Sequence, residues 1–170
     1  MPATTEAADI ARYAPSIHDS QPWRWRVSET SLDLYTDHRR RLGITDPDGR
    51  LAILSCGAAL HHARIALAAE GREARVVRLP DPGDPGHLAR VDIVGSIPVA
   101  PEAMRRIQTV RTRHTDRRPV TGTRLDDHTL AAITAAVGGE GASLHILPRD
   151  KVVELAAVSY AQQTEAAEQA

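Results

Sequence analysis

The chain has 170 residues and a mass of 18.4 kDa, which fits one ordinary domain with a real core and leaves little room for a second complete one. Apolar residues make up 42% but aromatic residues only 3%, so the core is expected to consist of Ala, Leu, Val and Ile in closely packed helices. The formal net charge of −1 offers no global field that would attract nucleic acid or an anionic membrane, and neither is expected as a partner.

The N-terminal segment predicts a helix, a loop and a β-hairpin. Residues 4–12 predict a short helix that begins at a capping Thr4, and Pro15 then keeps Ala14 out of helical geometry. Apolar and charged side chains alternate on both sides of a turn at Glu29 to Ser31, which predicts a hairpin over residues 23–36. The loop in APSIHDSQPWRW, residues 14–25, therefore leads straight into a strand.

A long central helix is predicted from Arg50 to Glu70, between the DPDG turn of residues 46–49 and Gly71. Its apolar residues recur at helical spacing and also cover the flanks, so other elements are expected to contact it on several sides. Cys56 lies within it as the lone cysteine and is expected to be a small, buried apolar residue.

The rest of the chain predicts strands over 74–79 and 88–95, joined by the loop PDPGDPGH, and then a helix that begins at Pro101. An arginine-rich segment, RTRHTDRRPV, covers residues 111–120. A capped helix within residues 125–141 that ends at Gly138 and Gly139, a strand over 142–147 and a helix over 150–170 are predicted to follow. The last helix has an apolar side that needs cover, so the chain is expected to be a fragment or one half of an assembly.

Three kinds of chemistry fit these residues poorly. His61 and His62 are adjacent and so point about 100° apart on a helix, and no metal site is expected. The arginine-rich segment lacks aromatic residues that would stack on bases, so it is better sized for one phosphate group than for a nucleic-acid strand, with a solvated basic loop as the plainer alternative. Ser16, His18 and Asp19 are too close in sequence for a hydrolytic relay, and there is no G-x-S-x-G motif.

A flat, anionic cofactor fits the same residues better. A loop stiffened by Pro15 and Pro22 holds backbone N–H and C=O groups at fixed positions, which suits the donors and acceptors that alternate along the edge of a flavin ring. The arginine-rich segment would then bind the phosphate, with Thr115 as a hydroxyl donor.

These segments resemble a known family. APSIHDSQPWRW resembles the A-P-S-x-x-N-x-Q-P-W segment of the FMN-dependent nitroreductases, and together with DPDGR, LSCGAALHHARIAL and LPDPGDPGHLARV it looks most like their Acg-like branch. RHTDRRPV, residues 113–120, is similar to the R-x-S/T-x-R/K segment that holds the FMN phosphate in ordinary nitroreductases.

The resemblance implies an α+β fold in which helices flank an antiparallel sheet around a long central helix. Nitroreductases are intertwined dimers that bind FMN between their subunits, and Acg-like proteins resemble such a dimer fused into one longer chain. On this map, residues 1–108 form the first half, and residues 109–170 start an incomplete second half that carries the phosphate-binding segment.

The resemblance also implies the residues of an FMN site. Pro15 and Ser16 would contact the ring edge, Gln21 and Trp23 would brace the loop, and Asp19 replaces the family's Asn, so that its charge would oppose an anionic reduced flavin. The whole implied set is Pro15, Ser16, His18, Asp19, Gln21, Arg113, His114, Thr115 and Arg117, the last four at the phosphate.

The implied function is an FMN-binding oxidoreductase that passes hydride from NAD(P)H through the flavin to a nitro or quinone-type acceptor. No catalytic side chain is expected, because the chemistry belongs to the flavin. A protein that sequesters flavin without turnover and a truncated structural remnant without flavin are the alternatives. Self-association or a missing C-terminal half is expected, and the absence of a signal peptide or membrane span predicts a cytoplasmic location.

Overall fold

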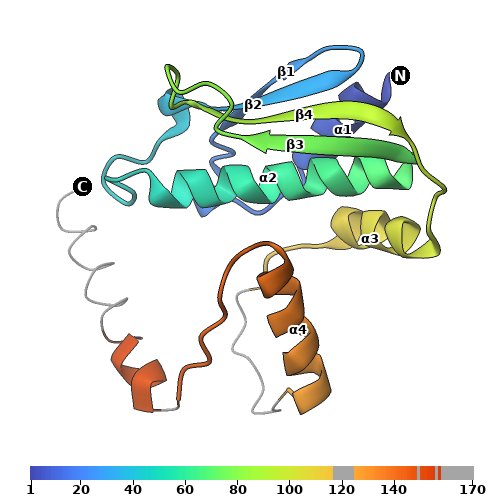
Figure 1. The fold of residues 1–170 in the computed structure, drawn as a ribbon. Coiled ribbons are helices and arrows are strands. Elements are labelled where there is room, and N and C mark those ends of the chain that lie inside the picture. Colours follow the sequence, from blue (N-terminus) through green and yellow to red (C-terminus); the bar gives the residue numbers. More distant parts are fainter. Residues whose placement is uncertain (117–124, 149, 156, 158–170) are drawn as a thin grey trace. The chain divides into compact units, whose positions relative to one another are not determined.

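The computed structural model describes residues 1–116, 125–148, 150–155 and 157, and the chain divides into two compact units, Met1–Thr115 and Asp116–Ala170. The predicted halves, 1–108 and 109–170, place the division elsewhere and stay a prediction. Unit 1 holds the sheet and most of the helices (Figure 1).

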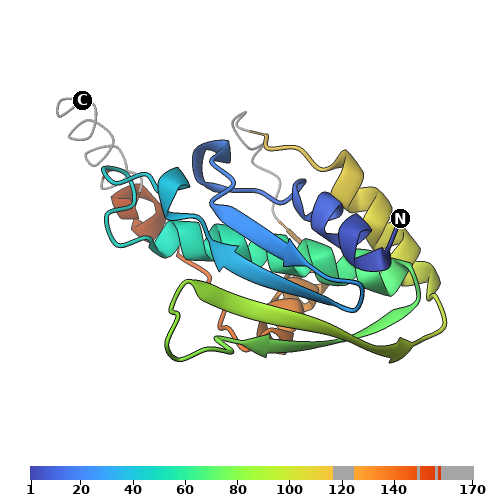
Figure 2. The same cartoon turned by 90° about the horizontal axis from the view of Figure 1, so that it is seen from above.

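Unit 1 contains a four-stranded antiparallel sheet in the order β1-β2-β4-β3 (Figure 2). Its strands are β1 (Trp23–Val27), β2 (Ser31–Thr36), β3 (Arg72–Arg78) and β4 (His87–Ser96). The predicted hairpin is confirmed, since Trp23 pairs with Thr36 and Val27 with Leu32. The two later strands form as well, β3 starting two residues before the predicted Ala74.

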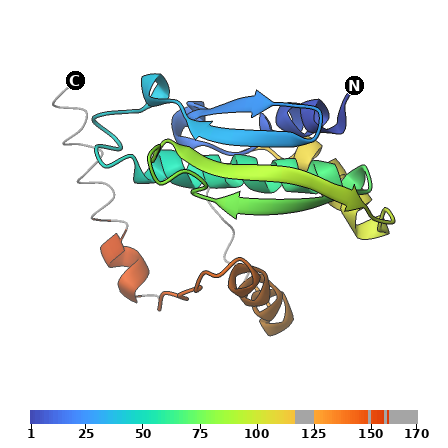
Figure 3. The ribbon, with the colours of Figure 1, turned by 45° about the horizontal axis from the view of Figure 1, so that its top comes forward.

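Three helices of unit 1 pack together, and α2 (Arg50–Ala69) lies along one face of the sheet (Figures 1 and 3). The helix α2 contacts α1 (Ala3–Ala11), α3 (Pro101–Thr112), β2 and β3, which confirms a central helix contacted on several sides. The α+β fold with an antiparallel sheet and helices is therefore as predicted.

The alternation of side chains along the strands separates the two faces of the sheet. Leu32, Leu34 and Val91 are buried in the core beneath the helices. The opposite face carries a polar network, in which Nε2 of His87 lies 2.9 Å from Oδ1 of the buried Asp33. His87 stacks on Tyr35, with ring centroids 4.4 Å apart, and covers part of this face. The guanidinium of Arg90 lies 3.3 Å from Asp33.

The structure corrects two local predictions. Thr4 is not the cap of α1, because Pro2 precedes the helix and the Thr4 hydroxyl instead donates to the carbonyl of Ser28 at 2.6 Å. Residues 142–147 form no strand. A strand needs a neighbour for its backbone groups, and the described part of unit 2 offers none.

Unit 2 contains α4 (Asp127–Gly139), which Asp126 caps by accepting a hydrogen bond from the Thr129 amide at 2.6 Å. This helix is as predicted, and residues 150–155 and 157 of the last predicted helix are helical. No described residue of α4 is fully buried, although Leu130 and Val137 are half-buried.

Among the described residues, α2 is long and apolar enough to cross a membrane by length and composition, although no such run was expected. Half of this stretch is buried inside the structure, which is the ordinary property of a core helix.

Candidate functional site

The loop between α1 and β1 has an unusual backbone. His18 (φ 46°), Asp19 (φ 55°) and Gln21 (φ 45°) all adopt the left-handed region, which glycine tolerates and other residues rarely enter. His18 and Asp19 belong to η1 (Ile17–Asp19), a single 3₁₀ turn. Each such conformation costs about 1–3 kcal/mol, so the surrounding contacts must hold the loop in place.

Hydrogen bonds inside the loop supply part of that support. The Ser16 hydroxyl oxygen accepts from the Gln21 amide at 3.1 Å, and the Ser16 carbonyl accepts from the Asp19 amide at 3.2 Å. The Gln21 carbonyl accepts from the Trp23 amide at 2.8 Å, and Trp23 itself is buried in the core. The loop is thus joined rigidly to the first strand.

Three side chains from other elements fasten the same loop. At its first end, Nη2 of Arg113 donates to the carbonyl of Tyr13 at 3.3 Å, and at its last end Nη1 of Arg40 donates to the carbonyl of Gln21 at 3.4 Å. In the middle, the Ile17 amide donates to the hydroxyl oxygen of Ser55 at 3.1 Å. The sequence analysis did not include Arg40 and Ser55 in the site. No local sequence pattern indicates which loop a side chain from a distant segment will contact.

The structure therefore brings part of the predicted site together. Arg113 follows α3 directly, and an ion pair of 3.3 Å between Arg111 and Glu6 joins the end of α3 to α1. His114 and Thr115 follow Arg113 and are exposed. No hydrogen bond to the loop is observed for either among the described residues, and Arg117 lies outside them.

The predicted loop residues differ in accessibility. Pro15, His18 and Asp19 are exposed, whereas Ser16 and Gln21 are half-buried. The hydroxyl oxygen of Ser20 is buried and has no hydrogen-bond partner among the described residues, which leaves an unsatisfied polar atom in the loop.

Two buried titratable side chains of α2, Cys56 and His62, interact with residues of the candidate site. Burial raises the pKa of Cys56 to about 12, and its Sγ lies 3.4 Å from the carbonyl of Pro22, so the thiol is a core group rather than a nucleophile, as predicted. Burial, followed by the positive charges of His61 and Arg113, lowers the pKa of His62 to about 4. His62 is therefore a neutral imidazole near neutral pH.

Comparison with known proteins places the chain among relatives from Mycobacterium tuberculosis strain H37Rv. It is 47% identical over 135 residues to "Putative NAD(P)H nitroreductase Rv3131", an alignment that covers 76% of this chain and 38% of that protein. It is 38% identical over 153 residues to "Putative NAD(P)H nitroreductase acg", which covers 90% of this chain and 46% of that protein. No protein-family model matches the chain.

The chain spans less than half the length of these curated relatives. The sequence identity over the matched residues and the α+β fold support the same family assignment. The chain belongs to the nitroreductase family, in its Acg-like branch.

Proposed function

We propose that this chain supplies one side of an FMN site and that the assembled protein is an NAD(P)H-dependent oxidoreductase. The observation that carries the proposal is the hydrogen bond between Arg113 and the carbonyl of Tyr13. It means that the start of the arginine-rich segment lies beside the strained loop within one compact unit. One cofactor with a planar ring and a phosphate could then be reached by both segments.

The residues present fit such a cofactor. The loop holds backbone and side-chain polar groups on a rigid frame, including the unsatisfied Ser20 hydroxyl, and guanidinium groups stand at both of its ends. Positive charge near a flavin favours the anionic reduced form, and the exposed carboxylate of Asp19 opposes it. Arg40 and Arg113 would supply positive charge at the two ends of the loop, against the negative charge of Asp19.

In this proposal the flavin, when bound, supplies the redox chemistry by accepting and donating hydride, and the protein residues position it. Pro15 and Ser16 would position the ring edge, and Arg113, Thr115 and Arg117 would hold the phosphate. Gln21 and Trp23 keep the loop in its left-handed conformation. His62 stays uncharged near neutral pH and so adds no positive charge to that of Arg113.

Titration with FMN and riboflavin tests this proposal. The purified protein is expected to take up FMN, with the visible absorption of oxidised flavin. Arg117→Ala is expected to weaken FMN binding by about 1.5–3 kcal/mol and to leave riboflavin unchanged, because only FMN carries the phosphate. Arg113→Ala is expected to weaken both ligands, and FMN more, because it also releases Tyr13.

Arg106→Ala is the matched control. It removes the same charge as Arg113→Ala, but Arg106 pairs with Glu102 on α3 and makes no hydrogen bond to the loop in the described part of the chain. A colourless protein that fails to take up added FMN would contradict the proposal. If FMN binds but NAD(P)H is not oxidised with a nitroaromatic or quinone acceptor, the protein sequesters flavin instead of turning over.

A further inference from the structure

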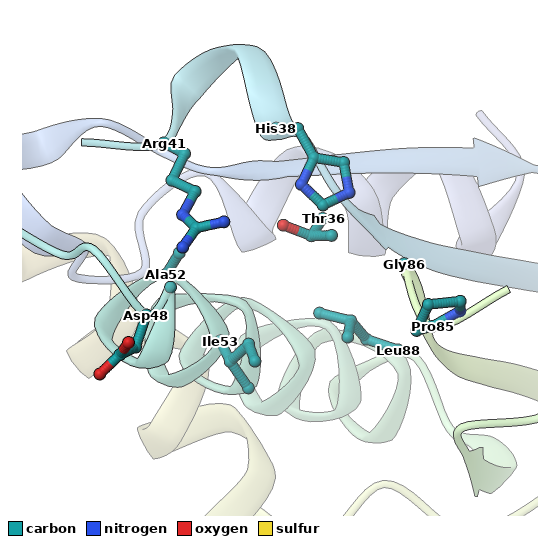
Figure 4. A pocket seen from close by; sticks show the side chains of 10 residues that line it. Thr36, His38, Arg41, Asp48, Ala52, Ile53, Pro85, Gly86 and Leu88 are labelled. Atoms are coloured by element: carbon teal, nitrogen blue, oxygen red, sulfur yellow. The ribbon is translucent and has the colours of Figure 1, made fainter. Parts of the chain in front are cut away.

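A cavity lies outside the residues that the sequence analysis assigns to the FMN site. It has a volume of about 150 Å³ and is formed where η2 (His38–Arg40) and the segment after it face the first turns of α2 and the start of β4. Figure 4 shows Arg41, His38 and Thr36 on one side of the cavity, with Ala52, Ile53 and Leu88 across it.

Arg41 is exposed, and its guanidinium also has contacts within the protein. It donates through Nη2 to the carbonyl of Pro47. It also lies over Gly49, where a Cβ would come within 3.4 Å of the Arg41 Cζ atom. Gly49 has a φ of 71°, a conformation that favours glycine, while a Cβ there would meet Arg41 only at an ordinary contact distance.

His38 is placed by the opposite wall. A Cβ at Gly86 would lie 3.7 Å from Nε2 of His38, an ordinary contact distance, so the imidazole lies close to this wall. The same Cβ would come within 3.1 Å of Oδ1 of Asp84. The carboxylate of Asp84 accepts from the Gly86 amide at 2.9 Å and is thereby engaged in its own turn. The side chain of Asp48 points away from the centre of the cavity (Figure 4).

Size and chemistry limit what the cavity can hold. Pockets for whole ligands usually have about 300–1,000 Å³, so this cavity is too small for a dinucleotide or a flavin ring and admits a single terminal group. A fork of guanidinium donors, an imidazole and a hydroxyl are donors that suit phosphate oxygens. The α2 amides of Leu51 and Ala52 are already bound by the Asp46 carboxylate and are not needed.

The cavity is connected to the candidate flavin loop through η2. Arg40 in η2 donates to the carbonyl of Gln21, and the Asp37 amide before η2 donates to the carbonyl of Pro22 at 2.9 Å. These two bonds attach η2 to the loop, and η2 also supplies His38 to the cavity. We propose that this cavity binds a phosphate monoester, namely the 2′-phosphate that distinguishes NADPH from NADH; this rests on the proposed function.

Calorimetric titration of the whole chain with 2′,5′-ADP, 5′-AMP and inorganic phosphate tests the proposal without turnover. We expect 2′,5′-ADP to bind at least about 10-fold more tightly than 5′-AMP or inorganic phosphate. Arg41→Ala is expected to weaken 2′,5′-ADP about 10- to 100-fold, the loss typical of a charge-assisted contact. Thr36→Val, which keeps the side-chain shape, is expected to weaken it severalfold.

Arg39→Ala is the matched control, because Arg39 belongs to the same turn but pairs with Asp37 at 3.1 Å and does not line the cavity. An equal loss for Arg39→Ala and Arg41→Ala would overturn the proposal, since it would indicate only general attraction of anions. Equal affinity for 2′,5′-ADP and inorganic phosphate would also overturn it, in favour of a site for free phosphate.

Kinetics separate this proposal from the proposed function. If FMN-loaded protein oxidises both nucleotides, Arg41→Ala is expected to lower kcat/KM for NADPH about 10-fold or more and to leave NADH unchanged. If Arg41→Ala turns over with the same preference between NADPH and NADH as the natural chain, the proposed role of the cavity is wrong, while the proposed function still holds. Absence of FMN uptake would contradict the proposed function, while the titration with 2′,5′-ADP would still decide what the cavity binds.

Discussion

At the scale of single residues, His62 shows how burial sets the charge of a group beside the candidate site. Its side chain is 7% exposed, and Nδ1 has no hydrogen-bond partner among the described residues. An unpartnered buried nitrogen tolerates a neutral ring far better than an imidazolium, and the cations at His61 and Arg113 add repulsion. Burial of His62 in the folded chain therefore favours its neutral state.

His62 predicts a pH dependence of stability. The unfolded chain binds a proton at the ordinary pKa of 6.5, whereas the folded chain binds it only at about 4. The unfolded state thus holds more protons between these values, and the free energy of unfolding is expected to fall as the pH is lowered from about 6.5 to about 4. Urea unfolding across this range measures it.

The variant His62→Gln provides the comparison, because it keeps a polar side chain that does not titrate. It should show a shallower decline than the natural chain over the same range, since the contribution of His62 is removed and only the other titratable groups remain. Identical declines in the two proteins would contradict this role of His62.

At the scale of elements, the start of α2 depends on one buried carboxylate. Asp46 accepts from the amide of Leu51 at 3.1 Å and from that of Ala52 at 2.8 Å. Burial by itself would raise the pKa of Asp46, but these amide hydrogen bonds and the charge of Arg41 outweigh it and lower the pKa. The carboxylate also interacts favourably with the helix dipole.

Asp46→Ala is expected to lower the free energy of unfolding by about 1–2 kcal/mol, because α2 loses its cap while the amides lose their partner. Asp46→Asn should cost less, since it keeps one acceptor. Asp48→Ala is a suitable control, because Asp48 is an exposed carboxylate of the same turn. Chemical denaturation compares the three, and equal losses at positions 46 and 48 would argue against the capping role.

At the scale of the whole molecule, both units leave large apolar side chains uncovered. On α2, Ile53 is 54% exposed and Leu54 is 69% exposed, while in unit 2 Ile146 is 63% and Val153 is 71% exposed. Exposed apolar surface of this kind usually marks an interface. The relatives are more than twice as long as the aligned part of this chain, which agrees with surfaces that further protein would cover.

Self-association of the 170 residues is therefore expected, and sedimentation at several concentrations measures it. Leu54→Lys should shift the weight-average mass toward the monomer, because a charge on the apolar surface disfavours association. Its stability should change by less than about 0.5 kcal/mol, since Leu54 is exposed. Gln108→Lys adds the same charge on an exposed position of α3 and should have no effect. A monomer at all concentrations would refute the expectation.

The sequence by itself determined the elements of unit 1 and their order. The central helix follows from helical periodicity between the DPDG turn and Gly71, and the hairpin from alternating side chains around Glu29 to Ser31. Such signals are local, because a helix or a hairpin is specified by neighbouring residues. The resemblance of residues 14–25 to the nitroreductases likewise needed no coordinates.

The tertiary structure alone decided what surrounds the candidate loop. The left-handed conformations of His18 and Asp19 persist because contacts from distant segments hold them, and no local pattern predicts such contacts. The same reason explains the absent strand at 142–147, where local propensity lacks a neighbouring strand to pair with. Arg40, Ser55 and Arg113 meet the loop only because the fold brings three separate segments together.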